Sequence, residues 1–134
     1  MKKLTIFTDG GSRGNPGPSA TGVVIKDDSK KTISAFGEYL GKQTNNYAEY
    51  MALISGLKKA KELGANEVDC IVDSKLVCEQ LNGNWKVRDK NIQKLFVQAY
   101  NQMQNFSKVK ISHTMRAGNK EADAEVNKIL DSKR

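Results

Sequence analysis

The sequence predicts an α/β domain in which helices cover a mixed β-sheet. Three apolar, alternating segments come first, at residues 4–9, 21–25 and 32–40, and short stretches connect them. Short connections between consecutive strands are typical of an antiparallel meander. Helical and extended segments then alternate to the end of the chain, as they do where helices connect parallel strands. A meander followed by such crossovers implies one sheet with antiparallel and parallel strands.

The bulk composition fits one such domain. The chain has 134 residues, and no linker, repeat or low-complexity segment divides residues 1–134. With 38% apolar and 28% charged residues, it has the composition of a soluble globular protein. Cys70 and Cys78 form no Cys-x-x-Cys pair, which indicates inert thiols in a reducing cytosol. The N-terminal residues hold no apolar run long enough for a signal sequence or a membrane span, so we expect a cytoplasmic protein.

The first strand is predicted by its alternation. Leu4, Ile6 and Thr8 fall on one face of this segment, and Asp9 closes it on the other face. A glycine-rich turn is expected over residues 10–17. The second and third strands are rich in apolar and β-branched side chains, and a polar turn separates them.

A long helix is predicted after the meander, over residues 44–63. Thr44 can cap its start, and Gly64 can end it. Its apolar stripe consists of Ala52, Leu53, Gly56, Leu57, Ala60 and Leu63. The later predicted elements are, in order, a strand at 68–72, a helix at 75–81 capped by Asp73 or Ser74, a loop at 82–89, a helix at 91–105, a strand at 109–113 and a terminal helix capped by Asn119.

Four carboxylates stand at positions that are unusual for surface acids. Glu49 lies at the edge of the apolar stripe of the long helix, and Asp123 extends the stripe of the terminal helix. Asp9 and Asp73 each end an apolar strand, at the sheet edge where sites form in open α/β sheets. Each acid also has a purely structural explanation: a turn for Asp9, a helix cap for Asp73, and the positive end of a helix dipole for the other two.

Together the four acids predict a metal site. Converging carboxylates without basic partners would repel one another, so one or more cations are expected among them. Ligation by carboxylates without Cys or His selects hard ions, Mg²⁺ or Mn²⁺. With two such ions, a site of this kind can bind phosphate oxygens, activate water and stabilise a leaving oxygen. The formal net charge of +7 independently favours an anionic partner such as nucleic acid.

Four sequence blocks resemble those of type 1 ribonuclease H, in the order of that family. Residues 8–11 (Thr-Asp-Gly-Gly), followed by 14–17 (Gly-Asn-Pro-Gly), resemble its opening signature. Residues 44–49 resemble its first-helix motif, 72–74 its fourth strand and 119–123 its last-helix motif. Each block is weak alone, but the set spans nearly the whole chain and is highly specific.

The resemblance implies a ribonuclease H-like fold, with a five-stranded mixed sheet in the order 3-2-1-4-5, the first three strands antiparallel and helices on both faces. It implies two Mg²⁺ ions, with Mn²⁺ as a substitute, bridged by Asp9 and further held by Glu49, Asp73 and Asp123. It implies endonucleolytic hydrolysis of the RNA strand of RNA–DNA hybrids, leaving 5′-phosphate and 3′-hydroxyl ends. Glu49 would also touch the 2′-hydroxyl beside the cut, the group that distinguishes RNA from DNA.

The resemblance also implies substrate-binding residues. These are Gly11, Asn15, Lys42, Thr44, Asn45 and Asn46. Asn15, Asn45 and Asn46 match positions that read the minor groove of the hybrid. Thr44, with Lys42 nearby, matches part of a pocket that grips a phosphate of the DNA strand.

The fifth catalytic residue has two candidates. His113 stands ten residues before Asp123, the spacing of the family's loop histidine, but it ends the predicted strand at 109–113, which favours a structural role. Arg116 stands seven residues before Asp123, as in a short-loop subgroup that lacks the basic protrusion. Because an arginine keeps its proton near neutral pH, Arg116 would steer the scissile phosphate or assist departure electrostatically. A solvated loop charge is the alternative for Arg116.

A second departure from the family concerns residues 82–89. This segment is too short for the basic helix and loop that many relatives insert there. The basic side chains left in the region are Lys86, Arg88, Lys90 and Lys94, which form either a reduced basic patch or a solvated face. Trp85 either stacks on the DNA strand or anchors the core. Asp89 stands where relatives often place an Asn of the phosphate pocket, and its charge would repel a phosphate.

Two other functions stay open at this stage. One is a non-catalytic module that binds RNA or the hybrid on the same fold, which the absent loop histidine and Asp89 favour. The other is a nuclease of the same fold that cuts double-stranded RNA. As partners we expect an RNA–DNA hybrid, with double-stranded RNA as an alternative substrate, no membrane, and no second copy of the chain, that is, a monomer.

Overall fold

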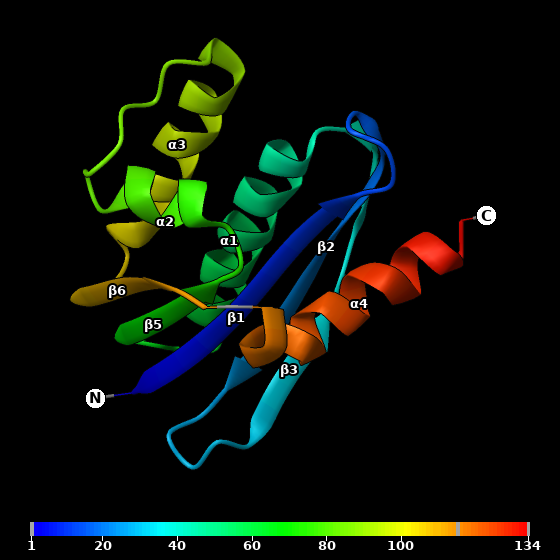
Figure 1. The fold of residues 1–134 in the computed structure, drawn as a ribbon. Helices are drawn as coiled ribbons and strands as arrows, with labels where there is room; N and C mark the ends of the chain where they lie inside the picture. The colour runs from blue at the N-terminus through cyan, green and yellow to red at the C-terminus, as the bar shows by residue number, and fades with distance from the viewer. Residues whose placement is uncertain (1, 115, 134) are drawn as a thin grey trace.

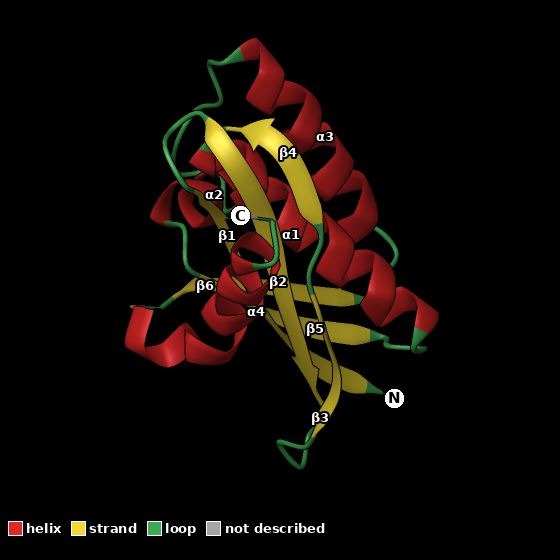
Figure 2. Cartoon of the chain, turned by 90° about the vertical axis from the view of Figure 1, so that its right-hand side faces the viewer, coloured by secondary structure: helices red, strands yellow, loops and turns green. Residues whose placement is uncertain are grey.

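One mixed β-sheet forms the centre of the molecule, and helices cover both of its faces (Figure 1, Figure 2). The computed structural model describes residues 2–114 and 116–133. The strands are β1 (Lys3–Ser12), β2 (Gly17–Lys26), β3 (Thr32–Phe36), β4 (Tyr39–Gln43), β5 (Glu67–Val72) and β6 (Lys108–His113). The helices are α1 (Asn45–Glu62), α2 (Lys75–Leu81), α3 (Lys90–Met103) and α4 (Lys120–Asp131), with a 3-10 turn, η1 (Arg116–Asn119), before α4.

The strand order is the predicted one. The main path through the sheet is β3-β2-β1-β5-β6, which is 3-2-1-4-5 when the main strands are numbered in sequence. β2 runs antiparallel to both β1 and β3, whereas β5 is parallel to β1 and β6 is parallel to β5. The apolar side chains of α1, α2 and α3 share one core, and α4 packs on a separate cluster across the sheet (Figure 1). The predicted fold class is confirmed.

The third predicted strand is two strands. The expected segment at 32–40 is interrupted after Phe36, and both β3 and β4 pair with β2, so the sheet has six strands within the described residues. At the interruption, the Thr21 N–H donates to the Glu38 carbonyl at 2.9 Å, and the Glu38 N–H donates to the Thr21 hydroxyl at 3.0 Å. The Thr21 side chain thus replaces a regular ladder bond, which side-chain periodicity does not reveal.

Strand β1 continues beyond Asp9, which corrects the expectation that Asp9 ends a strand. Residues 10–12 extend the antiparallel ladder with residues 19–21 of β2, so much of the predicted glycine-rich turn is strand. Glycine weakens a strand signal, but here it permits a close approach of helix α1. A Cβ at Gly10 would lie 2.2 Å from the carbonyl carbon of Ala48.

The parallel strands end beside two of the predicted acids, Asp9 and Asp73. The pairing of β1 with β5 ends at Thr8 and Val72, and the pairing of β5 with β6 ends at Val72 and His113. Asp9 directly follows Thr8, and Asp73 directly follows Val72. They therefore emerge side by side at the carboxyl edge of β5, as predicted for Asp73.

Two apolar clusters hold the helices in place. The main core lies between the sheet and α1 to α3, and it contains Leu53, Leu57 and Ala60 of the predicted stripe of α1, with Leu63 at its partly buried margin. Each aliphatic side chain buried in such a core contributes about 1.5–3 kcal/mol to the free energy of unfolding. Helix α4 rests on the other face through a much smaller cluster, formed by Ala20, Val126 and Leu130.

Side chains cap three helices, and two of these caps, Thr44 and Ser74, were predicted. The hydroxyl oxygens of Thr44 and Ser74 accept hydrogen bonds from N–H groups in the first turns of α1 and α2. The Asp89 carboxylate does the same for α3, which starts one residue earlier than predicted. Asn119 precedes α4 as predicted, but its side chain makes no cap bond, so its predicted capping role is wrong.

Trp85 does not anchor the core. Its side chain is 44% exposed on the loop between α2 and α3, and the Lys75 ammonium lies 5.9 Å from the centre of its ring. The short loop keeps the indole at the surface, where the Lys75 ammonium can make a cation–π contact with it.

Candidate functional site

The four predicted acids come together from four elements. Asp9 lies in β1, Glu49 near the start of α1, Asp73 between β5 and α2, and Asp123 in the first turn of α4. All four line one pocket of about 460 Å³. One carboxylate oxygen each from Asp9, Glu49 and Asp73 can be chosen so that all lie within 4.8 Å of one another.

Local hydrogen bonds position two of these carboxylates. Oε1 of Glu49 accepts a hydrogen bond from the N–H of Gly10, so the close contact of α1 with β1 fixes Glu49 beside Asp9. Oδ2 of Asp123 accepts a hydrogen bond at 3.3 Å from the side-chain amide of Asn127, one turn later in α4. The Asp123 carboxyl also lies close enough to Asp9 to contribute to the pKa shift of that acid.

Burial and mutual repulsion shift the pKa values of the two central acids. Desolvation, the hydrogen bond with Asp123 and the charge of Asp73 raise the pKa of Asp9 from 3.8 to about 7. Desolvation and the charge of Asp9 raise the pKa of Glu49 well above its usual value, although the Gly10 N–H partly opposes this. Both acids resist ionisation in the absence of a positive charge.

These residues fit a divalent cation. Arg13 is the basic side chain among the described residues that line the pocket, and its described ion pair is with Asp131 at 2.7 Å, not with any of the four acids. Clustered carboxylate oxygens with raised pKa values offer the hard donor set that Mg²⁺ and Mn²⁺ prefer. A divalent ion would supply the missing positive charge.

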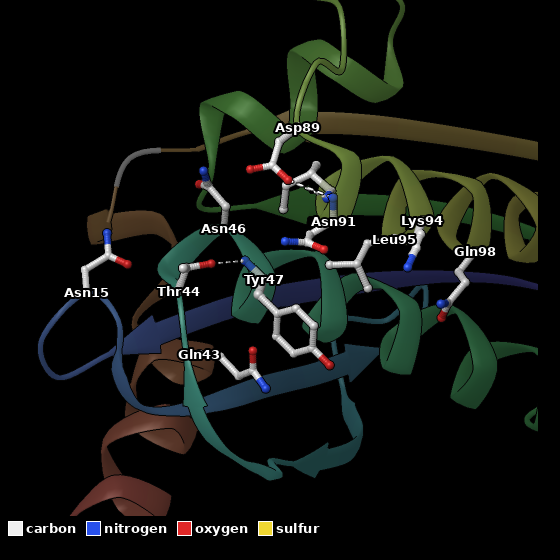
Figure 3. A pocket seen from close by; sticks show the side chains of 11 residues that line it. Asn15, Gln43, Thr44, Asn46, Tyr47, Asp89, Asn91, Lys94, Leu95 and Gln98 are labelled. Atoms are coloured by element: carbon white, nitrogen blue, oxygen red, sulfur yellow. Dashed lines mark hydrogen bonds between the residues drawn. The ribbon is translucent and has the colours of Figure 1, made fainter.

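A second pocket, of about 680 Å³, lies between the starts of α1 and α3 (Figure 3). The predicted substrate residues Asn15 and Thr44 line it, and Asn46 lines both this pocket and the pocket of acids. Lys94 of α3 also faces it. The structure therefore brings these three predicted substrate residues to one concave surface beside the acids.

Asp89 also lines the second pocket, but its charge is partly engaged. Its Oδ1 accepts hydrogen bonds from the N–H groups of Asn91 and Ile92, at 2.8 and 3.2 Å. A carboxylate at a helix N-terminus is stabilised by those donors and by the helix dipole. Asp89 is thus a helix cap inside a pocket that was expected to hold a phosphate.

The other predicted substrate residues divide into two groups. Gly11 and Asn45 line the pocket of acids. Oδ1 of Asn45 accepts from the Ser12 N–H at 2.9 Å, and the Asn45 N–H donates to Oδ1 of Asn15 at 3.1 Å, which ties the β1–β2 hairpin to the start of α1. Lys42 lies exposed on β4 and is not among the residues that line either pocket.

Of the two candidates for a fifth catalytic residue, the structure describes the side chain of His113 but not that of Arg116. His113 is the exposed last residue of β6, as predicted, and does not line the pocket of acids among the described residues. Arg116 begins the turn η1, but its side chain lies outside the described part of the structure.

The exposed basic residues near the loop 82–89 include Lys94, which lines the second pocket.

Sequence reasoning missed three polar residues around the acids. Nη2 of Arg13 donates to Asp131 at 2.7 Å and to Asn127 at 3.4 Å, and Asn127 in turn holds Asp123. The side-chain amide of Asn119 donates to the carbonyl of Thr8 at 2.6 Å. One signal was available: Asn119 and Asn127 each stand one helical turn from Asp123 in the sequence.

No helix among residues 2–114 and 116–133 combines the length and the apolar character that crossing a membrane requires.

Known proteins resemble the chain over nearly its whole length. The family model of reverse transcriptase-like proteins matches residues 7–129. Ribonuclease HI of Halobacterium salinarum is 39% identical over 129 residues, which are 96% of this chain and 65% of the relative. The bifunctional protein Rv2228c of Mycobacterium tuberculosis is 43% identical over 131 residues, which are 97% of this chain and 36% of the relative. The chain thus spans less than two thirds of either curated relative.

Solved structures show the same likeness. RNase H1 from the halophilic archaeon Halobacterium salinarum superposes with a TM-score of 0.94 at 38% identity, over 97% of this chain and 98% of that one. LC11-RNase H1, crystallised in complex with an RNA/DNA hybrid, gives 0.92 at 35% identity, over 96% and 97%. The N-terminal RNase H domain of Rv2228c gives 0.91 at 42% identity, over 94% and 97%. With this fold and this cluster of acids, the chain belongs to the reverse transcriptase-like family and, within it, to the type 1 ribonuclease H family.

Proposed function

We propose that the chain is a metal-dependent ribonuclease H, an endonuclease that hydrolyses the RNA strand of RNA–DNA hybrids, and that residues 1–134 act as a single catalytic domain. The observation that carries the proposal is the convergence of Asp9, Glu49, Asp73 and Asp123 in one pocket. The likeness to ribonuclease HI and to a relative crystallised with an RNA/DNA hybrid supports this substrate.

The four acids would hold two Mg²⁺ ions, for which Mn²⁺ can substitute. Asp9 interacts with each of the other three acids, and it would be the ligand that the two ions share. When bound, such ions supply Lewis-acid chemistry at the phosphate and a nucleophile from water at neutral pH. The raised pKa values of Asp9 and Glu49 favour uptake of positive charge at this position.

The chain's own groups select and hold the RNA strand. Hydrolysis joins a water oxygen to phosphorus and breaks the bond to the 3′ oxygen, which takes up a proton, so the products carry 5′-phosphate and 3′-hydroxyl ends. Oε1 of Glu49 is bound by Gly10. Its other oxygen can accept a hydrogen bond from a 2′-hydroxyl, and DNA lacks that group.

The surrounding residues would bind the rest of the hybrid. Asn15, Asn45 and Asn46 would contact the minor groove, and Gly11 would contact the substrate beside the acids. The residues proposed to hold a DNA-strand phosphate are Thr44 and Lys42. Thr44 has a pocket beside it, whereas Lys42 would have to reach the phosphate from the exposed face of β4.

Arg116 is the proposed electrostatic aid to catalysis, in keeping with a short-loop subgroup that lacks the basic protrusion. Support for the subgroup comes from the chain between α2 and α3, where only residues 82–89 lie outside the two helices. A guanidinium close to the last helix would attract the scissile phosphate without exchanging a proton.

A cleavage assay tests the proposed function. The protein is incubated with an end-labelled RNA–DNA duplex in Mg²⁺ or Mn²⁺, beside Asp9→Asn and Asp73→Asn. We expect RNA fragments with 3′-hydroxyl ends from the wild type and a loss of at least about 10³-fold in the variants, because each removes a proposed metal ligand. Equal cleavage by wild type and variants would reveal a contaminating nuclease.

The same assay separates the alternatives. Parallel incubation with an RNA–RNA duplex measures activity on double-stranded RNA. Tight binding of the hybrid in chelator, without turnover in either metal, would instead identify a non-catalytic binding module and overturn the proposal.

A further inference from the structure

The side chain of Asn119 is turned away from the helix that it precedes. Asn119 occupies the cap position of α4, yet its Nδ2 donates a hydrogen bond of 2.6 Å to the carbonyl oxygen of Thr8 in β1. The two residues are 111 positions apart, and the Asn119 side chain is only 2% exposed. A buried bond of this length connects the first turn of α4 directly to the central strand.

This orientation of the Asn119 side chain does not stabilise helix α4. A cap side chain normally accepts a hydrogen bond from the helix N–H groups, and Asn119 accepts none. Its Oδ1 is a buried side-chain atom that has no hydrogen-bond partner in the described structure. A serine would cap the helix with a shorter side chain. The asparagine therefore stabilises the junction with β1 and leaves the end of the helix uncapped.

The junction lies between two of the four acids. Thr8 immediately precedes Asp9, and its carbonyl oxygen is part of the peptide bond that leads into Asp9. Asn119 stands directly before α4, four residues before Asp123 in the first turn of that helix. The other polar links from α4 to the sheet, such as the ion pair of Lys26 with Glu121, are at exposed positions.

We propose that Asn119 is a positioning residue that sets the distance between Asp123 and Asp9 through the carbonyl of Thr8, and with it the affinity of the site for divalent ions. The inference rests on the proposed function, because it assigns Asp123 to the metal shell. Asn119 touches neither substrate nor metal; it acts through the backbone of β1.

Asn119→Ser tests this role because it exchanges the hydrogen bond to the Thr8 carbonyl for a cap on helix α4. Serine supplies the missing cap, but its hydroxyl is too short to reach Thr8. We expect a melting temperature equal to or above that of the wild type. We also expect a kcat about 10–100-fold lower, a KM for the hybrid within about twofold of the wild type, and a 10–100-fold weaker affinity for Mn²⁺ by titration calorimetry.

Tyr50→Phe is the matched control. The Tyr50 hydroxyl donates a buried hydrogen bond of 2.6 Å to Gln80, and neither side chain is among the residues that line the pocket of acids. We expect this variant to lose stability while kcat and Mn²⁺ affinity stay unchanged. Asn119→Ala should lose stability and also show the lower kcat.

The outcomes separate the inference from the proposed function. Wild-type cleavage with an unimpaired Asn119→Ser overturns the inference and leaves the function standing. A loss of kcat that follows melting temperature across all three variants also overturns it, since a merely structural role predicts that correlation. If the wild type cleaves nothing, the proposed function fails, and unchanged Mn²⁺ affinity in Asn119→Ser then overturns the inference on its own.

Discussion

The charge state of Asp9 depends strongly on folding. Its pKa rises from 3.8 to about 7 through burial and through the carboxyls of Asp123 and Asp73, and Glu49 is shifted in the same direction. Between those two pH values the folded chain retains a proton that the unfolded chain releases. The free energy of unfolding of the metal-free protein therefore falls as pH rises through this window, by an amount on the order of a few kcal/mol.

Replacing Asp9 with Asn removes this ionisation. In chelator at about pH 8, we expect Asp9→Asn to melt at a higher temperature than the wild type, because a neutral amide replaces a buried carboxylate. The difference should shrink toward about pH 4, where the wild-type carboxyl is protonated. Calorimetric melting across this range measures both effects.

The response to metal provides the complementary measurement. At about pH 8, Mn²⁺ should raise the melting temperature of the wild type far more than that of Asp9→Asn, because the ion binds only where folding brings the acids together. A variant that is less stable than the wild type in chelator at this pH would contradict the repulsion among the acids.

Asp89 combines a favourable local role with an unfavourable one in binding. Asn caps a helix about as well as Asp, so Asp89→Asn should change the free energy of unfolding by less than about 0.5 kcal/mol. It also removes a negative charge from the second pocket, and we expect the KM for the hybrid to fall about 2–10-fold at unchanged kcat. Steady-state kinetics at fixed salt measures this change.

Asp28→Asn is the control for net charge. Asp28 is an exposed acid in the turn between β2 and β3, and it lines neither pocket of the proposed site. An equal fall in KM for both variants would assign the effect to the overall charge of the protein and not to the phosphate pocket.

The sequence could reveal the four acids but not the residues that support them. An acid that extends an apolar stripe, such as Glu49 or Asp123, interrupts a visible pattern. Arg13 and Asn119 are polar residues at ordinary polar positions, and their partners lie 114 and 111 residues away. Pairs at such separations have no local signature, so only the folded chain discloses them.

At the scale of the elements, the contact of α1 with β1 controls the position of Glu49. A Cβ at Gly10 would meet the backbone of Ala48 and Glu49 at 2.2–2.4 Å, and backbone atoms cannot move aside as a side chain can. We expect Gly10→Ala to push the start of α1 from the sheet, to lower kcat by about 10²-fold or more, and to cost about 1–3 kcal/mol of stability. Cleavage rates and denaturant unfolding measure the two effects.

Gly83→Ala is the control that strains the backbone without displacing helix α1. Gly83 has a φ of +80° in the loop after α2, and a Cβ there would meet nothing within 4 Å. We expect a loss of about 1–2 kcal/mol, from the left-handed backbone alone, at unchanged kcat. If Gly10→Ala resembled Gly83→Ala in its kinetics, the contact of α1 with β1 would not determine the position of Glu49.

Element types could be predicted more securely than element ends. Helix α2 has the predicted bounds, and α1 differs by one residue at each end, because caps and apolar periodicity mark a helix locally. The extension of β1 past Asp9 and the interruption between β3 and β4 depend on backbone pairing with β2. Backbone pairing leaves little trace in the sequence of the strand itself.

At the scale of the whole molecule, the topology could be predicted because few arrangements accommodate a meander followed by crossovers. The resemblance of four blocks to one family then fixed the strand order. The division of the interior into a large and a small apolar cluster was not predicted, since periodicity shows that a helix has an apolar stripe but not which face of the sheet receives it.

That division has a consequence for heat inactivation. Three of the acids belong to elements held by the main core, whereas Asp123 belongs to α4, which rests on Ala20, Val126 and Leu130. Local opening of α4 breaks fewer contacts than opening of α1, so its amide hydrogens should exchange with solvent sooner than those of α1, in measurements by mass spectrometry or NMR. Equal protection of the two helices would exclude such opening.

A chain in this partly open form keeps its sheet and its main core but presents three carboxylates in place of four. On heating, the proposed cleavage should then decline reversibly, several degrees below the temperature at which the sheet melts. The upper working temperature of the protein would be set by one peripheral helix and its few apolar anchors, and stronger packing in the main core would not raise it.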